Sequence, residues 1–223
     1  MPYFPAKNLV LLPATAADIP TLVNIYFKSF TTFFRRRAFP DTPYVREWWE
    51  KSLRKEIQND HALFLKVVEP KSTLGIGNNP EGPIIAWAQW KKPKELHKGD
   101  GQTLPAWPKG ADVLLCEQHF GDLTRKHHEL MRERPHWYLE LLATDPKHQK
   151  RGAGSVLLRH ILANADATGH ETYLEAPPHA APIYRKFGFK ERDKVDVNVQ
   201  VDSGTEVYRN WCMVREPGAE QGR

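Results

Sequence analysis

A chain of 223 residues, 40% hydrophobic and 26% charged, is long enough to bury one substantial core, and this composition excludes a disordered or collagen-like protein. The net charge of +5 suits an anionic ligand, but no nucleic-acid-binding motif accompanies it, so we predict no binding to DNA or RNA. The chain has two cysteines and no Cys-rich framework, which predicts a cytoplasmic protein. It has no run close to the roughly twenty apolar residues that span a bilayer, so we predict no membrane binding. A nuclear location is the alternative.

The first elements follow simple patterns. An apolar run at 9–12 predicts a strand, and Thr15 with Asp18 resembles a capping box that opens a helix. After two prolines that break the structure, a second helix is expected over about 44–58.

Two strands and two loops come next. Apolar runs at 62–68 and 84–90 predict antiparallel strands, joined by an exposed hairpin loop at 75–82. The stretch 91–110 shows no sustained periodicity, and such a long structureless segment in a compact domain is usually functional or disordered. We interpret 91–110 as an insertion or lid near a binding site.

Four aromatic residues gather near the end of the first helix: Phe27, Phe30, Phe33 and Phe34. Aromatic side chains at this spacing either pack into the core or line a binding site, and the sequence leaves both interpretations open.

A helix is expected over 111–134, and Gly121 is the point at which it could divide. The segment carries His119, His127 and His128, which raises the question of a metal site. No Cys/His pair here has the spacing of a structural zinc site, so we expect no metal.

Residues 137–155 predict a strand, a glycine turn and a helix in succession. The apolar run 138–143 is typical of a central strand, and helical spacing resumes after the turn and continues to about Gly169. The turn itself, 149–154, reads Gln-Lys-Arg-Gly-Ala-Gly. Its glycines let the backbone approach a ligand closely, and the unpaired amides and dipole of the next helix favour a pyrophosphate.

This turn fits the pattern Gln/Arg-x-x-Gly-x-Gly/Ala and resembles the acetyl-CoA-binding turn of the GNAT superfamily of N-acetyltransferases. A second motif adds to the resemblance. Ala180 lies four residues before Tyr184, and Gly-Phe follows four residues after that Tyr, as in many GNAT enzymes. One position departs from the family, which often has an Asn where this chain has Pro177.

The resemblance implies an α/β (α+β layered) fold with a mixed, mostly antiparallel sheet of about six or seven strands, flanked by helices on both faces. A strand at 171–176, a helix at 179–187 and strands at 189–196 and 205–214 complete the chain.

We expect one domain over 1–215 with the insertion at 91–110, and a mobile tail over 216–223.

The same resemblance implies acetyl-CoA as co-substrate and assigns its contacts residue by residue. They lie on the strand end, the turn, the following helix and the later helix: Leu142, Ala143, Thr144, Gln149, Lys150, Arg151, Gly152, Ala153, Gly154, Ser155 and Tyr184.

The implied reaction is direct attack of a primary amine on the thioester, without a covalent acetyl-enzyme. The amine, with a pKa of about 10.4, must lose a proton, the thioester oxygen must be stabilised, and the thiolate must be protonated. The family implies Tyr184 as the proton donor; the alternative is a Tyr that positions the sulfur. Backbone amides of 141–143 are the family's means of stabilising the oxygen.

Glu140 is the only carboxylate within the 138–143 strand and is our candidate base, directly or through water. The alternative is a structural Glu paired with a neighbour. In an ideal strand Glu140 shares a face with Tyr138 and Leu142, so its direction depends on any bulge. His136 and His179 are weaker candidates, each expected to be a loop residue with a satisfied hydrogen bond.

We therefore predict an N-acetyltransferase that moves an acetyl group from acetyl-CoA to a primary amine of a small molecule. The alternatives are a protein lysine or N-terminal acetyltransferase and, from another class, a non-catalytic acyl-CoA-binding or regulatory module. Because the final strand often mediates dimers in this family, a homodimer stays open.

Overall fold

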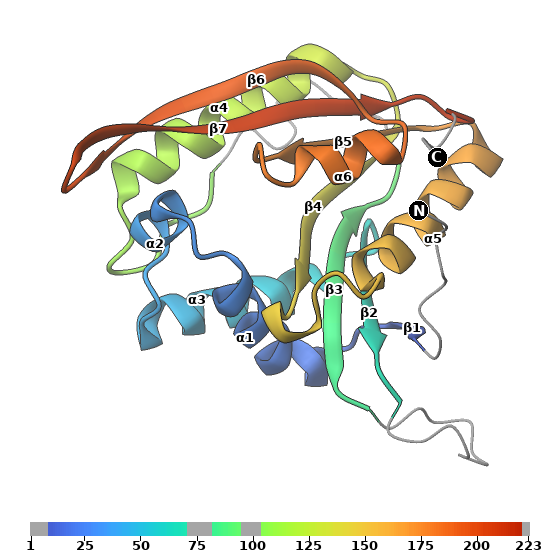
Figure 1. Cartoon of the computed structure of the whole chain (residues 1–223), viewed down its shortest axis with the longest axis horizontal. Coiled ribbons are helices and arrows are strands. Elements are labelled where there is room, and N and C mark those ends of the chain that lie inside the picture. The colour runs from blue at the N-terminus through green and yellow to red at the C-terminus, as the bar shows by residue number, and fades with distance from the viewer. Residues whose placement is uncertain (1–8, 71–81, 95–103, 220–223) are drawn as a thin grey trace.

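The structure is a computed structural model that describes residues 9–70, 82–94 and 104–219 (Figure 1). The elements of its first half are β1 (Val10–Pro13), a 3₁₀ turn (Ala16–Asp18), α1 (Ile19–Ser29), α2 (Phe33–Ala38), α3 (Pro43–Glu56), β2 (Ala62–Val68) and β3 (Ile84–Lys91). Those of its second half are α4 (Val113–Met131), β4 (His136–Thr144), a 3₁₀ turn (Pro146–His148), α5 (Ala153–Thr168), β5 (Glu171–Ala176), α6 (Ala181–Lys186), β6 (Lys190–Val201) and β7 (Gly204–Arg215).

The strands form one seven-stranded sheet in the order β1-β2-β3-β4-β5-β7-β6. Neighbouring strands are antiparallel except for β4 and β5, which are parallel and lie side by side in the middle of the sheet. The predicted mixed, mostly antiparallel sheet of six or seven strands with helices on both faces is therefore confirmed.

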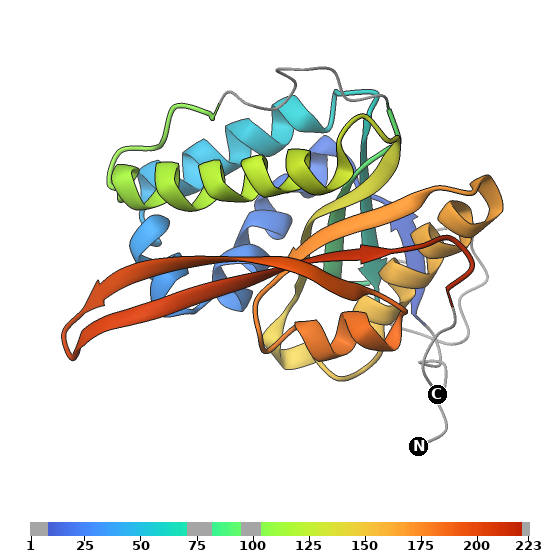
Figure 2. The same cartoon turned by 90° about the horizontal axis from the view of Figure 1, so that it is seen from above.

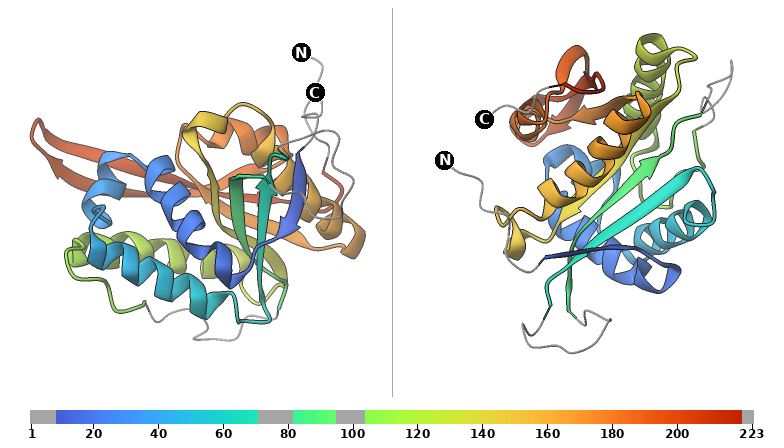
Figure 3. Two further views of the ribbon diagram at one scale, coloured as in Figure 1. Left: turned by 90° about the horizontal axis from the view of Figure 1, so that it is seen from below. Right: turned by 90° about the vertical axis from the view of Figure 1, so that its right-hand side faces the viewer.

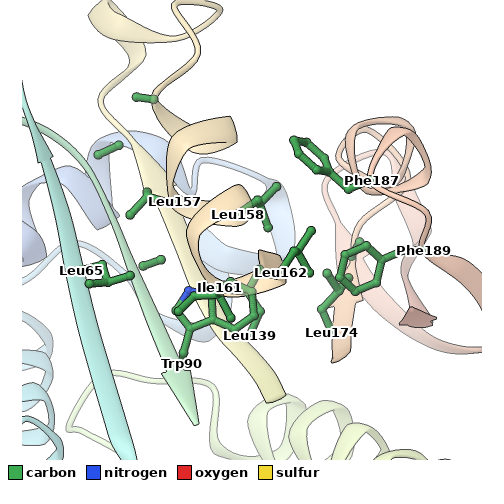
Figure 4. Close-up of a cluster of buried hydrophobic side chains, with 14 of the residues drawn as sticks. Leu65, Trp90, Leu139, Leu157, Leu158, Ile161, Leu162, Leu174, Phe187 and Phe189 are labelled. Carbon is green, nitrogen blue, oxygen red and sulfur yellow. The ribbon is translucent and has the colours of Figure 1, made fainter. Parts of the chain in front are cut away.

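Helices cover both faces of the sheet (Figure 3). On one face α5 packs across the central strands, and its Leu157, Leu158, Ile161 and Leu162 point toward the sheet (Figure 4). On the other face α1 and α3 pack over β2, β3 and β4, while α4 packs over β5, β6 and β7. The β6–β7 hairpin extends beyond the rest of the sheet, alongside α4 and α2 (Figure 2).

Local sequence signals explain where several helices begin and end. The Thr15–Asp18 capping box is present, and it opens the 3₁₀ turn that leads into α1. Thr42 caps α3 by accepting a hydrogen bond from the backbone N–H of Val45 at 3.4 Å. Gly169 ends α5 with a φ of 69°, a conformation that glycine adopts without strain.

Two features differ from the sequence-based expectation. Helix α2, over Phe33–Ala38, was not predicted from the sequence; Thr32 caps it, and it ends before Pro40. Helix α4 runs unbroken through Gly121, where an added Cβ would meet only one side chain, at 3.8 Å.

The C-terminal end is held against α5 through a buried guanidinium. Arg215 forms a bidentate ion pair with Asp166 at 2.6 and 2.9 Å and donates to the carbonyls of Phe187 and Ala219. The amide of Gly218 also donates to Asp166, at 2.6 Å. Residues 216–219 of the expected mobile tail are thus anchored, whereas 220–223 lie outside the described residues. So do most of the 75–82 loop and 95–103 of the expected lid.

Candidate active site

Strands β4 and β5 separate partway along their length. Their parallel pairing runs only from His136 opposite Glu171 to Leu139 opposite Leu174, although β4 continues to Thr144. Beyond that point β4 pairs with β3 and β5 pairs with β7. The described structure therefore leaves the β5-facing side of β4, from residue 140 onward, without a strand partner. The backbone amides of 141–143, expected to stabilise the thioester oxygen, lie on this separated part.

A β-bulge at Glu140 sets the direction of the side chains that follow. On β3, Gln89 lies opposite Leu141 and the next residue lies opposite Leu139, so Glu140 is an extra residue on β4. After the bulge, Leu142 packs toward α5, while Leu141 and Ala143 pack toward α1. The ideal-strand expectation that Glu140 shares a face with Leu142 is wrong for this reason.

The Glu140 carboxylate lies on the face that α3 covers. It accepts a hydrogen bond from Gln89 Nε2 at 2.5 Å, and Lys91 Nζ lies 3.6 Å away and also pairs with Glu56 of α3. Burial raises the pKa of Glu140 to about 7 despite the opposing charge of Lys91, although the side chain remains 28% exposed. A partly accessible carboxylate with a pKa near neutrality has the properties of a general base.

A second carboxylate, which the sequence analysis missed, belongs to Glu175 on β5. Its Oε2 accepts a hydrogen bond from the Tyr138 hydroxyl at 2.9 Å, while its Oε1 is buried without a partner among the described residues. Burial raises the pKa of Glu175 to about 7; the nearby charge of Glu140 also raises it, while hydrogen bonds to the carboxylate lower it. The available sequence signal was a charged residue next to the apolar Leu174 and Ala176 near the end of a strand.

The glycine turn lies at the other end of β4. Lys150 and Gly152 have φ values of 61° and 88°, and this left-handed geometry turns the chain into α5. Gly154 lies beside the side chains of Leu142 and Thr144, at distances where an added Cβ would make ordinary van der Waals contacts. Gln149 Nε2 donates to the Thr144 carbonyl at 3.3 Å, which ties the turn to the strand.

The start of α5 presents unpaired amides. The first intrahelical bond is donated by Val156 to Gly152, and no bond among the described residues takes up the amides of Ala153, Gly154 and Ser155. Arg151 pairs with Glu69 at the end of β2. The predicted turn residues are therefore brought together around the helix terminus, as an anion cradle requires.

Tyr184 lies on α6 and packs against the cluster beneath α5, with its ring 5.9 Å from that of Phe189. Burial raises the pKa of Tyr184 to about 12, so the phenol keeps its proton at neutral pH. Its hydroxyl has no hydrogen-bond partner in the described part of the chain. Tyr184 and Glu140 lie on opposite faces of the sheet, and the separation of β4 from β5 connects these faces.

The face that carries Glu140 is bounded by segments from distant parts of the chain. Arg37 of α2 donates to Asp112 Oδ2 and to the Gln200 carbonyl of the β6–β7 hairpin, both at 2.7 Å. Trp48 Nε1 donates to the Ala106 carbonyl at 2.8 Å, which holds the end of the expected lid against α3.

The four aromatic residues near α1 all pack in or against core clusters, as the core interpretation expects. Phe34 is fully buried in the core, whereas Phe27, Phe30 and Phe33 are half-buried.

The two weaker histidine candidates lie in different surroundings. His136 is buried on β4 rather than in a loop, donates through Nδ1 to the Arg134 carbonyl and lies 2.6 Å from the Nε2 of His127. His179 is exposed in the turn before α6. Across the described ranges, no three His, Cys, Asp or Glu side chains gather as a metal site would require.

Comparisons with known proteins identify a domain match and a shared fold. Residues 111–191 match the model of the acetyltransferase (GNAT) domain. The structure is similar to that of histone acetyltransferase HPA2 and related acetyltransferase from Corynebacterium glutamicum, at 22% identity and a TM-score of 0.56, covering 96% of this chain and 99% of that one.

Two further structures are similar. The ribosomal-protein-S18-alanine N-acetyltransferase from Escherichia coli is 15% identical with a TM-score of 0.55, over 96% of this chain and 98% of the other. Arabidopsis thaliana NAA60, solved with a bisubstrate analogue, is 14% identical with a TM-score of 0.56, over 96% of this chain and 100% of the other. The domain match and the shared fold together indicate an acyltransferase. No helix in the described part of the chain is long and apolar enough to cross a membrane.

Proposed function

Because the fold and the domain matched by residues 111–191 are those of GNAT acyltransferases, we propose that this protein transfers an acetyl group from acetyl-CoA to a primary amine of a small molecule. Amine and thioester would meet in a ternary complex, in which the amine attacks directly.

The donor side fits the pyrophosphate of acetyl-CoA. The amides of Ala153, Gly154 and Ser155 are unpaired in the described structure and point out of a helix terminus, where the helix dipole also favours an anion. Lys150 adds a positive charge beside them. When bound, acetyl-CoA supplies the acetyl group as a reactive thioester.

Three chemical roles fall to residues near the separation of β4 and β5. Glu140 removes a proton from the acceptor ammonium, because its pKa of about 7 leaves a usable fraction ionised at neutral pH. Unpaired amides of the 141–143 segment stabilise the developing negative charge on the oxygen. Tyr184, which keeps its proton, donates it to the departing thiolate.

The bulge at Glu140 is the observation that carries this proposal. It places a carboxylate with a raised pKa on the α3 face, next to the separation of the two strands, while the phenol and the anion cradle lie with α5 and α6 on the other face. The pairing of Glu140 with Gln89 and Lys91 also fits a structural Glu, and substitution of Glu140 separates the two roles. The proposal requires that the acceptor amine reach the thioester where β4 and β5 separate.

A small-molecule acceptor is favoured over a peptide by the segments that bound the Glu140 face. The hydrogen bond of Trp48 to the Ala106 carbonyl and the contacts of Arg37 with α4 and the β6–β7 hairpin hold these segments together. An extended peptide needs an open path past them, whereas a compact amine does not.

A thiol-release assay with acetyl-CoA and a panel of amines that includes peptides tests the proposal. We expect release of CoA with at least one small primary amine and a stoichiometric acetylated product by mass spectrometry. Faster transfer to lysine-containing peptides or to peptide N-termini would support the protein acetyltransferase alternative. Measurable acetyl-CoA binding with no transfer to any amine would point to a non-catalytic module.

A further inference from the structure

We propose that Arg35 binds a carboxylate of the acceptor, so that the substrate is an amine that also carries an acidic group. This inference rests on the proposed acetyl transfer and names the class of its acceptor. It comes from an unusual guanidinium on α2.

Arg35 has no carboxylate partner among the described residues. Its neighbours on the surface do: Arg37 pairs with Asp112, and Arg46 pairs with Asp41. The guanidinium of Arg35 instead lies over aromatic rings, 5.2 Å from the centroid of Phe30 and 5.8 Å from that of Phe34.

The donors of Arg35 are largely unused. A guanidinium carries five N–H donors in a planar fork that matches a carboxylate. In the described part of the chain, Arg35 donates from Nη1 to the Tyr26 hydroxyl at 3.5 Å and also interacts with the Tyr208 hydroxyl, while its Nε is buried without a partner. The residue as a whole is half-buried, and the guanidinium itself is enclosed by the aromatic rings around it. A planar anion that reaches the guanidinium would supply the missing acceptors.

A second buried polar group lies beside the same rings. His119 of α4 is fully buried, and neither ring nitrogen has a hydrogen-bond partner within the described residues. Its ring lies 4.3 Å from that of Phe34 and 5.1 Å from that of Phe120, and Arg35 lies over both rings. Burial and the charge of Arg35 lower the pKa of His119 to about 3, so its imidazole is neutral and retains one N–H donor.

Arg35 and Glu140 lie on the same face of the sheet. Tyr26, the hydrogen-bond partner of Arg35, belongs to the cluster in which Leu141 packs, next to Glu140 on β4. Phe120, beneath the guanidinium, packs in the cluster that includes Tyr138, two residues before Glu140. A molecule on this face meets carboxylates at β4 and β5 and a guanidinium at α2, which suits an ammonium at one end and a carboxylate at the other.

Matched pairs of acceptors test this assignment. Each pair consists of an amino acid and the amine left after removal of its carboxylate: γ-aminobutyrate with propylamine, lysine with cadaverine, and phenylalanine with phenethylamine. The wild-type protein is expected to acetylate the acid-bearing member of at least one pair with the higher kcat/KM. Arg35→Gln should lower that kcat/KM about tenfold or more, through KM, and leave the decarboxylated amine unchanged.

Controls separate binding from folding. Arg36→Gln alters the exposed neighbouring arginine and should change neither member of a pair. Arg35→Lys keeps the charge but loses the planar fork, so it should fold as the wild type does and retain only part of the preference. The assignment is overturned if Arg35→Gln and Arg35→Lys lower kcat/KM equally for both members of a pair, or if neither variant lowers it for either member. Arg35 is then a structural cation held by aromatic rings.

A binding measurement distinguishes this inference from the proposed function. Calorimetric titration with each acid-bearing member and its decarboxylated partner requires no turnover. If no amine is acetylated but Arg35→Gln still abolishes selective binding of an acid-bearing member, acetyl transfer is wrong and the carboxylate site stands. If wild-type protein binds both members of every pair equally, the carboxylate site is wrong whatever the assay of transfer shows.

Discussion

The donor side and the acceptor side of this molecule are built in different ways. The donor side comes from one stretch of chain, in which β4, the glycine turn, α5, β5 and α6 follow one another between residues 136 and 186. The acceptor side is assembled from α1, α2, α3, α4 and the β6–β7 hairpin, which long-range contacts bring together. A contiguous stretch can carry a recognisable motif, whereas an assembled face shows its chemistry only after folding.

Although β4 is part of the donor stretch, the bulge directs the Glu140 side chain to the acceptor side. Substitution of Glu140 is expected to have the largest effect on turnover. Glu140→Gln should lower kcat by about 10² to 10⁴, because a general base is lost, and leave acetyl-CoA affinity unchanged. In the wild type, kcat/KM should fall about tenfold per unit as pH drops below the pKa of about 7, since the protonated carboxyl cannot accept a proton.

Stopped assays across pH measure both effects. The control Glu47→Gln removes a carboxylate whose side chain is 60% exposed on α3 and should behave as the wild type does. If Glu140→Gln retains full turnover and the same loss of activity at low pH, another group accepts the proton. Glu175 is then the next residue to replace.

Tyr184 tests the donor side. Tyr184→Phe should reduce turnover about a hundredfold, because the phenol no longer protonates the departing thiolate. Tyr44→Phe, at a position that is 59% exposed, is the matched control. Thiol release followed from pH 6 to pH 9 gives the measurement. Turnover that barely changes at any pH would mean that Tyr184 only positions the sulfur.

The glycine turn gives a smaller effect with a close control. Gly152→Ala places a side chain at a φ of 88°, which costs about 1 to 2 kcal/mol and shifts the amides that start α5. We expect the Kd for acetyl-CoA to rise about tenfold by calorimetry. Gly169→Ala introduces the same strain at the far end of α5, with a φ of 69°, and should leave that Kd unchanged. Equal loss of affinity in both variants would argue against the cradle.

Replacement of His119, on the acceptor side, is expected to give the smallest effect, which is a change in the pH dependence of stability. Its pKa of about 3 in the folded state lies below the unfolded value, so the unfolded state takes up protons first as pH falls through about 6.5. When the pH is lowered from 7.5 to 5.5, His119 should therefore reduce the free energy of unfolding by about 1.4 kcal/mol. His119→Phe should remove that loss, as measured by urea unfolding at both pH values.

Glu140 and Glu175, whose pKa values are raised, titrate in the opposite sense, but they do so equally in the wild type and in His119→Phe. The difference between the two proteins therefore isolates His119. An unchanged pH dependence in His119→Phe would show that the imidazole is not the neutral group described.

The same division explains what the sequence could predict. The cradle around Gly152 and the phenol of Tyr184 lie in short motifs whose spacing is fixed by a turn or a helix, so the sequence predicts where they lie. Apolar runs also predict most of the strands, and the family resemblance implies the mixed, mostly antiparallel sheet that they form. The bulge at Glu140 could not be predicted, because strand pairing across β3 creates it. Glu175 and Arg35 acquire their character only from long-range neighbours.

Arg215 has a consequence for motion. One buried side chain fastens the end of α5, through Asp166, to the residue after α6, through the Phe187 carbonyl. The two helices that frame the proposed cofactor site therefore move as one rigid body, because relative displacement would strand a buried guanidinium without its partners. On the acceptor side, by contrast, the link between α2 and the β6–β7 hairpin runs through the exposed Arg37, so it contributes less stability than the buried Arg215 does.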